Sequence, residues 1–310
     1  MAEVENCQVC FNALSSGDLI RCANNHSIHF SCYRKLQKKE CIFKCETDYC
    51  FVSLQLSHSD IQKIDAAIEN PENKQKELNK KLLDAAKNKR WQLVKNALQE
   101  GAEVNARDQG NNTALLWAAY HNNLEIVRFL VERGADVNVV DNDGLNSIHN
   151  MFLNKDIKEP SLELLDYLLE QKLDIDAQIN KGNTALHFAL DNGYDIMANI
   201  LLDRGANPLI PANDNETCIY RIHPSIAEAT LQRILAAGVN INAQSNDGYS
   251  ALHYACENNR QSVIRMLLSN GAAPRLLDNK GKSPLSYLLT NEDDSEEHAE
   301  FIRFCIAQGM

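Results

Sequence analysis

The sequence lacks long apolar runs and lacks an export signal. None of its 310 residues belongs to a run approaching the ~18 apolar residues that a membrane-spanning helix needs. The N-terminal segment MAEVENCQVC has neither the basic start nor the apolar centre of a secretory signal peptide. We therefore expect a cytoplasmic protein in a reducing compartment, with no membrane span.

Positive charge is also scarce. The chain carries 31 Lys and Arg against 42 Asp and Glu, a formal net charge of -11. Binding to nucleic acid depends on clustered cations that neutralise phosphates. The composition therefore argues against nucleic acid as the main partner, although Arg34 to Lys44 includes a local basic patch.

Cysteine is rare outside one short region. Beyond residue 50 only Cys218, Cys256 and Cys305 occur, each flanked by apolar residues, which predicts small buried side chains. The other seven of the ten cysteines lie between Cys7 and Cys50. In a reducing compartment such a cluster predicts metal binding rather than disulfides.

The rest of the chain repeats itself. GAEVN at Gly101 recurs as GADVN at Gly134, GANPL at Gly205, GVNIN at Gly238 and GAAPR at Gly271, in steps of 33 residues with one gap of 71. KLDID, beginning at Lys172, fills that gap together with a short insertion. A second marker keeps the same phase, as TALLWAA, NSIHNMF, TALHFAL, TCIYRIH, SALHYAC and SPLSYLL.

Each repeat combines a turn with two helical patterns. Turns such as DNDG, ending at Gly144, favour positive φ angles. A Thr or Ser such as Thr113 then stands where a helix would begin. The second pattern, as in LEIVRFLVERG, has apolar residues at helical spacing and ends on a glycine. A unit of this size cannot bury its apolar face alone, so the repeats should stack.

These motifs resemble the ankyrin repeat, a turn followed by two antiparallel helices, from about Asn79 to the C-terminus. The resemblance implies a mainly α solenoid of six to seven repeats. It also implies that the residue after each TxLH tetrad faces a concave groove. With their neighbours, the expected groove residues for a protein substrate are Trp117, Tyr120, His121, Phe188, Arg221, Tyr254 and Tyr287.

Two interpretations of these groove residues stay open. Aromatic side chains and Arg are typical anchors of protein interfaces, but large side chains also pack between neighbouring repeats. The tetrad histidines His149, His187 and His253 are expected to be structural, with hydrogen bonds that join adjacent repeats.

The N-terminal cysteines and histidines occur in close pairs. Their spacing is Cys7-x2-Cys10-x11-Cys22-x3-His26-x2-His29-x2-Cys32-x8-Cys41-x3-Cys45-x4-Cys50. Zinc binds four thiolate or imidazole ligands in a tetrahedron, and a close pair supplies two of them. A segment this short has little apolar core, so bound metal would supply its folding energy.

This order resembles a RING finger, which binds two zinc ions in an interleaved pattern. The resemblance implies one zinc held by Cys7, Cys10, His29 and Cys32, and a second held by Cys22, His26, Cys41 and Cys45, with Cys50 as the alternative to one of the last pair. RING fingers promote ubiquitin transfer by binding a ubiquitin-conjugating enzyme, without a covalent intermediate or a catalytic residue of their own. The implied contact residues are Val9 and Leu36.

The sequence departs from the RING pattern in two places. CIFKC, which ends at Cys45, lacks the usual proline and has one extra residue. The arginine that often follows the last ligand is replaced by Glu46, or by Phe51 if Cys50 is that ligand. Other interpretations of the cluster are a structural zinc domain for docking, a Cys22–His26 nucleophile pair and a redox CQVC motif.

Together the two resemblances predict residues 1–56 as a RING-like zinc domain, 57–76 as a helical linker broken at Pro71, and 77–310 as the ankyrin domain. The implied function is a RING-type ubiquitin ligase whose groove holds the protein substrate. The alternative is a non-enzymatic adaptor. Ankyrin proteins also occur among bacterial effectors, in which case the expected location is the host cytoplasm.

Overall fold

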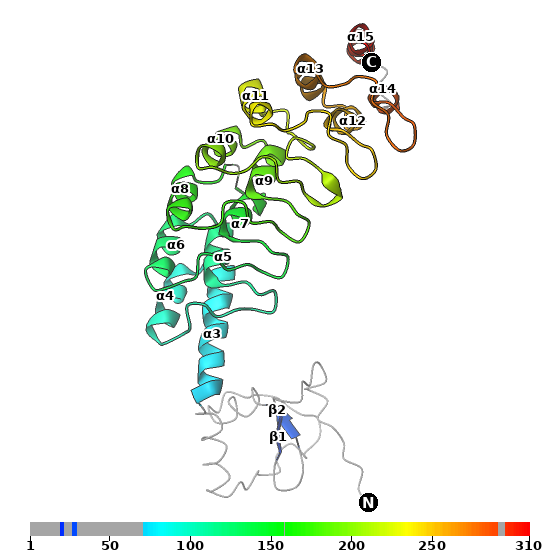
Figure 1. Cartoon of the computed structure of the whole chain (residues 1–310). Coiled ribbons are helices and arrows are strands. Elements are labelled where there is room, and N and C mark those ends of the chain that lie inside the picture. Colours follow the sequence, from blue (N-terminus) through cyan, green and yellow to red (C-terminus); the bar gives the residue numbers. More distant parts are fainter. Residues whose placement is uncertain (1–18, 22–26, 30–70, 158, 291–294) are drawn as a thin grey trace, which may run out of the picture. The chain divides into compact units, whose positions relative to one another are not determined.

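The computed structural model describes residues 19–21, 27–29, 71–157, 159–290 and 295–310, with the backbone alone given for residues 19–21, 27–29 and 71. The chain divides into two compact units, 1–77 and 78–310, and each is described by itself (Figure 1). In the first unit, β1 (Leu19–Arg21) and β2 (Ser27–His29) pair antiparallel. Their register places Leu19 opposite His29 and Arg21 opposite Ser27.

Apart from the backbone of His29, the predicted zinc ligands and both predicted contacts for a conjugating enzyme lie outside the described residues. The zinc domain therefore stays a prediction.

The second unit is a stack of helices in two rows joined by hairpin loops (Figure 1). We call the row nearer the loops the inner row. It contains α3 (Pro71–Lys87), α5 (Ala114–Tyr120), α7 (Ser147–Leu153), α9 (Ala185–Asn192), α12 (Ala251–Glu257) and α14 (Pro284–Leu288). The outer row contains α4 (Trp91–Gln99), α6 (Leu124–Val131), α8 (Leu162–Glu170), α10 (Asp195–Asp203), α11 (Glu228–Ala236), α13 (Gln261–Ser269) and α15 (Glu296–Ala307).

The inner helices begin at the polar residues that the sequence indicated. The Thr113 hydroxyl accepts a hydrogen bond from the Leu116 amide, and Asn146 caps α7 in the same way. In α9 and α12 the N-cap residue and the tetrad histidine bond reciprocally, as a capping box. These bonds satisfy amides that a helix start leaves without a partner.

The repeat glycines occupy turns with positive φ, for example Gly134 at 84°. Lys172 stands at the same repeat position and adopts φ of 59°. The predicted register therefore holds through the copy without glycine, although a lysine is less suited to this conformation.

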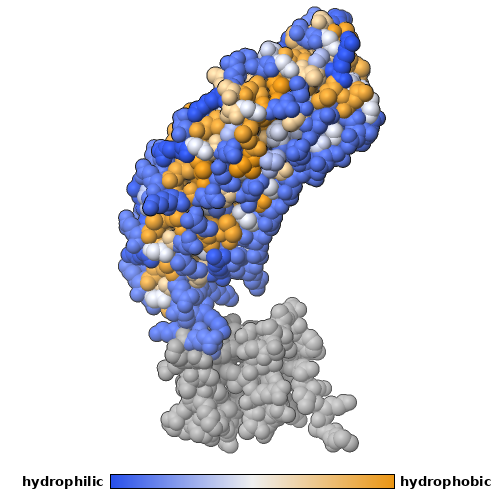
Figure 2. Space-filling view, viewed as in Figure 1, coloured by the Kyte–Doolittle hydropathy of each residue, from blue (hydrophilic) through white to orange (hydrophobic). Residues whose placement is uncertain are grey.

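One apolar core runs between the two rows from α3 to α15. Its largest fully buried side chains include Leu82, Leu115, Leu130, Leu168 and Phe301. Figure 2 shows a mainly hydrophilic surface over the hairpin loops and apolar residues among the helices. A single repeat cannot fold alone, so the stack requires a core that continues from one repeat to the next.

Asparagine side chains join consecutive hairpin tips. The side-chain amides of Asn142, Asn180, Asn213 and Asn279 each donate to a backbone carbonyl of the preceding tip, at 2.8 to 3.1 Å. Backbone bonds accompany them, such as the Asn180 amide to the Asp143 carbonyl at 2.8 Å. The loops are therefore fixed relative to one another.

α3 is described from Pro71 onward, and the helical segment predicted before Pro71 lies outside the described residues. One feature differs from the sequence expectation. Counting α3 and α4 as the first repeat, the fifth repeat has no inner helix: residues 217–227 form turns, whereas equivalent residues elsewhere form α9 and α12. Pro224 contributes to this, since proline inside a helix removes a hydrogen bond and clashes with the preceding turn.

Bonds from both neighbouring repeats hold this interrupted segment. The His223 amide donates to the Leu190 carbonyl of α9 at 2.9 Å. From the other side, the Arg260 guanidinium donates to the carbonyls of Arg221 and Ile222 at 2.9 and 3.0 Å. Carbonyls that a helix would have bonded internally therefore find a partner from another repeat.

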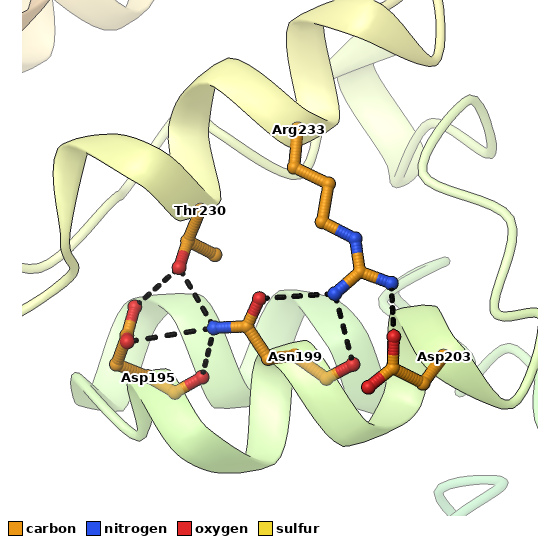
Figure 3. Close-up of polar contacts among 5 residues, drawn as sticks. All are labelled: Asp195, Asn199, Asp203, Thr230 and Arg233. Carbon is orange, nitrogen blue, oxygen red and sulfur yellow. Dashed lines mark hydrogen bonds and ion pairs between the residues drawn. The ribbon is translucent and has the colours of Figure 1, made fainter.

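A polar network also joins the outer helices α10 and α11 here (Figure 3). The Thr230 hydroxyl donates to the Asp195 carboxylate at 2.7 Å and accepts from the Asn199 amide at 2.8 Å. Arg233 donates to the Asn199 side-chain oxygen at 3.1 Å and pairs with Asp203. Since Asp195, Asn199 and Asp203 are spaced four residues apart, they form one row along α10 that faces α11.

Candidate functional site: the inner-row surface

The expected groove residues lie on or beside the inner row. Trp117, Tyr120, Phe188 and Tyr254 are half-buried on the inner helices, and His121 directly follows α5. Arg221 lies in the interrupted repeat, with 47% of its side chain exposed. Apart from Phe188, the structure places these residues in two clusters rather than in one continuous line.

The first cluster, which we call the tryptophan cluster, contains Trp91, Trp117, Tyr120 and His121. The His121 ring lies 5.1 Å from Tyr120, 5.7 Å from Trp91 and 6.3 Å from Trp117, measured between ring centroids. Trp117 and Tyr120 meet edge to face at 5.9 Å. Repeat periodicity did not indicate Trp91, which comes from α4 and is brought to α5 only by stacking.

Polar bonds fix the rings of the tryptophan cluster. The Trp117 indole donates to the Asp108 carboxylate of its own hairpin at 3.3 Å. The His121 Nε2 donates to the Lys87 carbonyl at 2.9 Å, so the neutral ring carries its proton on Nε2. Burial lowers the pKa of His121, which keeps the ring neutral near pH 7.

The second cluster, which we call the arginine cluster, contains Tyr220, Arg221, Tyr254 and Arg260. The Tyr220 and Tyr254 rings lie 5.3 Å apart. Arg221 and Arg260 lie over the Tyr254 ring, at 5.9 and 5.1 Å from its centroid, within the range of cation–π contacts. Sequence periodicity indicated Arg221 and Tyr254, while Tyr220 and Arg260 were missed.

Charged groups surround the arginine cluster. Arg221 forms an ion pair with Glu216 at 3.2 Å. Burial raises the pKa of the Asp191 carboxyl, an effect that Arg221, Arg260 and His223 oppose. The cluster therefore carries both signs of charge on a partly desolvated surface.

Two expected groove residues have internal partners. Tyr287 is only 7% exposed, and its hydroxyl donates to Asp278 at 2.5 Å. Phe188 packs edge-on against His149, with 5.5 Å between ring centroids. Tyr287 therefore lies in the stack, where it offers little surface to a partner.

The tetrad histidines are buried parts of the stack. His253 bonds to Ser250 at its own helix start and reaches the Lys282 carbonyl of the next repeat at 3.2 Å. His149 and His187 bond to the N-cap residues of their own helices. Burial lowers the pKa of both His149 and His187 to about 4, so both are neutral at pH 7.

No set of three or more His, Cys, Asp or Glu side chains among the described residues could hold a metal ion. Burial raises the pKa of the thiols of Cys218, Cys256 and Cys305, which accordingly are not reactive thiolates. Within the described residues, no helix is long and apolar enough to cross a membrane.

Comparison with known proteins agrees with this architecture. The family profile described as ankyrin repeats in three copies matches residues 82–158 and 224–307, and a second ankyrin-repeat profile matches 155–202. The chain belongs to the ankyrin-repeat family. Ankyrin repeats are protein-interaction modules, so the fold indicates a protein partner.

Individual relatives match only in part. The B-cell lymphoma 3 protein homolog of Mus musculus is 30% identical over 157 residues, which cover 49% of this chain and 35% of that protein. A putative ankyrin repeat protein of fowlpox virus is 26% identical over 145 residues, covering 47% of this chain and 24% of that protein. This chain thus matches about a third or less of the length of either protein.

The ankyrin repeat domain of human ASB11, solved as a crystal structure, superimposes with a TM-score of 0.59 and 21% sequence identity. The match covers 72% of this chain and 96% of that one. At this level of identity the similarity concerns the fold alone.

Proposed function

We propose that the ankyrin stack binds a segment of a partner protein across its inner-row surface, anchored at the tryptophan cluster and the arginine cluster. The observation that carries this proposal is the grouping of half-buried aromatic rings with cationic side chains on one row of the stack. Trp, Tyr and Arg dominate the binding energy of protein interfaces. The aromatic content of the chain is only 6%, so this grouping is not a consequence of composition.

Binding of peptides selected from a random display library against the full chain tests the proposal. Trp117→Ala or Tyr254→Ala should weaken binding of the selected peptides by about tenfold or more, since truncating a hot-spot residue costs about 2 kcal/mol or more of binding free energy. Phe304→Ala on outer helix α15 is the matched control, because Phe304 is a half-buried aromatic outside the inner row. Equal losses from all three variants would contradict an inner-row site.

We further propose that the N-terminal unit binds two zinc ions through the ligand sets given above. The support is the paired spacing of its cysteines and histidines. The pairing of β1 with β2 adds to it: Arg21 and Ser27 are opposite each other, and they directly flank the segment from Cys22 to His26. Zinc would supply folding energy and no bond-making chemistry. A reducing cytoplasm would keep the thiols available as ligands.

The function that joins both units is RING-type ubiquitin ligation. Val9 and Leu36 would contact a ubiquitin-conjugating enzyme charged with ubiquitin, while the inner-row surface holds the substrate. The transfer would be promoted by proximity and by restraint of the thioester, with no nucleophile from this chain. The competing function is an adaptor whose two units only bind proteins.

Two measurements separate these functions. Metal analysis of the purified chain should give two zinc ions, and one or none would contradict the interleaved sites. A ubiquitination assay against a panel of conjugating enzymes should show activity that Val9→Arg abolishes while zinc content is unchanged. A folded, zinc-loaded chain that is inactive with every enzyme would leave only the adaptor.

A further inference from the structure

The tryptophan cluster has a cationic rim. Lys87 ends α3, Lys89 and Arg90 lie in the turn that joins α3 to α4 just before Trp91, and all three side chains are exposed. The Lys87 ammonium lies 5.5 Å from the centroid of the Trp117 ring. Lys89 acts electrostatically on His121, helping to lower its pKa after the larger effect of burial.

These cations have no acidic partner among the described residues. Some exposed cations of the stack pair with carboxylates, as Arg204 does with Asp166 and Arg233 with Asp203. Others, such as Lys155, Lys181 and Lys280, form no ion pair among the described residues, as at the rim. At the rim, the neighbouring Asp108 already accepts from the Trp117 indole and from its own hairpin amides. The whole chain has a net charge of -11, so three cations within four residues, with no ion pair in the described part of the chain, make this surface locally positive.

The backbone at Lys89 gives a second, independent observation. Lys89 adopts φ of 58°, a left-handed conformation that suits glycine and asparagine. The equivalent positions of later repeats carry Asn122, Gly193 and Asn259, all with positive φ. A lysine thus occupies a turn position where the neighbouring repeats have better-suited residues, as Lys172 does at its own turn, and at Lys89 the side chain adds a cation beside the tryptophan cluster.

We infer that the rim and the tryptophan cluster form the docking site for an acidic protein segment that carries an apolar or aromatic residue. Carboxylates of the segment pair with Lys87, Lys89 and Arg90, and its apolar side chain packs on Trp91 and Trp117. This inference rests on the proposed protein-binding function and names the chemistry of the partner. A short cluster of three cations in an acidic chain favours a peptide over a nucleic acid, whose affinity depends on many phosphate contacts.

The protein carries its own reporter for this site. Trp91 and Trp117 are its two tryptophans, and both belong to the cluster. A ligand bound at the rim therefore changes tryptophan emission, whereas a ligand bound at the arginine cluster, where Tyr254 lies, leaves it nearly unchanged. Emission thus separates the two clusters within one unmodified chain.

The experiment selects peptides from a random display library on the full chain and titrates the enriched peptides while following tryptophan emission. We expect enrichment in Asp and Glu, a clear change in emission, and affinity that falls as salt is raised. The triple variant Lys87→Glu, Lys89→Glu and Arg90→Glu should lose at least about tenfold in affinity. The triple variant Lys155→Glu, Lys181→Glu and Lys280→Glu has the same net charge, alters exposed side chains elsewhere, and should bind as the parent does.

Lys89→Gly tests whether the Lys89 side chain contributes to peptide binding without destabilising the fold. It relieves the positive φ and removes the charge, so the variant should melt at the same temperature or higher while binding acidic peptides more weakly. Unchanged binding in this variant and in the rim triple would overturn the inference. So would equal losses in both triple variants, or enrichment of neutral or basic peptides.

Failure of this inference is distinguishable from failure of the proposed function. Selected peptides that leave tryptophan emission unchanged but lose binding on Tyr254→Ala would overturn the rim site and retain inner-row binding. Preference for a single-stranded oligonucleotide over every selected peptide would overturn both.

Discussion

The fifth and sixth repeats share one register and differ in structure. In the sixth, Ser250 and His253 form a capping box and residues 251–257 form α12. In the fifth, the equivalent stretch from Thr217 forms turns and is held by bonds from α9 and from Arg260. The apolar residues Cys218, Ile219 and Ile222 are nevertheless buried. The comparison shows that stacking requires apolar side chains to be buried at the same positions of each repeat. A helix is only one of the ways in which the backbone hydrogen-bonding groups there find partners.

The largest expected effect is a loss of stability at acidic pH, caused by buried histidines in the repeats that have both helices. His149 and His187 have folded pKa values of about 4 against an ordinary value of 6.5. The unfolded chain binds more protons between these values, so stability is complete above pH 6.5 and falls as the pH drops toward 4. The loss is on the order of 3 kcal/mol for each histidine. Urea unfolding followed by circular dichroism at several pH values measures it.

His187→Gln should remove roughly half of this acid-induced loss, since one of the two titrating groups is gone. His223→Gln in the interrupted repeat is the control. Its ring is more exposed than that of His187, so the pH dependence should change less. The same pH dependence in His187→Gln as in the parent chain would contradict the role given to the buried ring.

The next effect concerns the network that joins α10 and α11. Thr230→Val removes a buried hydroxyl that bonds both Asp195 and Asn199, which should cost about 1–3 kcal/mol of unfolding free energy. Thr217→Val in the same repeat makes the matching change at a half-buried hydroxyl outside the network and should cost about 0.5 kcal/mol or less. Chemical denaturation of both variants is the measurement, and equal losses would mean that the network is not specifically stabilising.

A smaller effect is expected at the turns. Lys172→Gly should stabilise the stack by up to about 1 kcal/mol, because lysine is strained at φ of 59°. Gly134→Ala makes the reverse change where an added methyl group meets no atom within 4 Å, so the conformation alone is tested. It should destabilise by about 1 kcal/mol. Shifts of the same sign in the two variants would contradict this account.

The smallest effect is expected at Pro224. Pro224→Ala permits a helix, but the bonds from His223 to Leu190 and from Arg260 keep the segment in its present path. We expect a change in stability below about 1 kcal/mol, arising mainly in the unfolded chain, and no gain in helical circular dichroism. A clear gain of helix would show that proline alone interrupts the repeat.

The regular part of the fold was predictable because local signals agree there. Cap residues such as Thr113, turn glycines such as Gly134 and the 33-residue period all point to the same helix pairs. The ankyrin identity and the need for stacking followed. The loss of the fifth inner helix was signalled by Pro224 but obscured by the strong periodicity around it.

The site was predictable only in part. The position of a residue within the 33-residue repeat indicated Trp117, Arg221 and Tyr254 as groove residues. It could not indicate Trp91 or Arg260, which reach the clusters from other helices or turns through stacking, nor the burial of Tyr287 against Asp278. Contacts between repeats depend on three-dimensional register, which sequence spacing alone does not determine.

Hydrogen exchange of the full chain, alone and bound to a library-selected peptide, tests the central claim most directly. If the inner-row surface is the binding site, protection should increase around Trp117 to His121 and around Tyr220 to Arg221 and Tyr254, with little change in outer helices α10 and α13. Protection confined to the outer helices, with the inner row unchanged, would contradict the account.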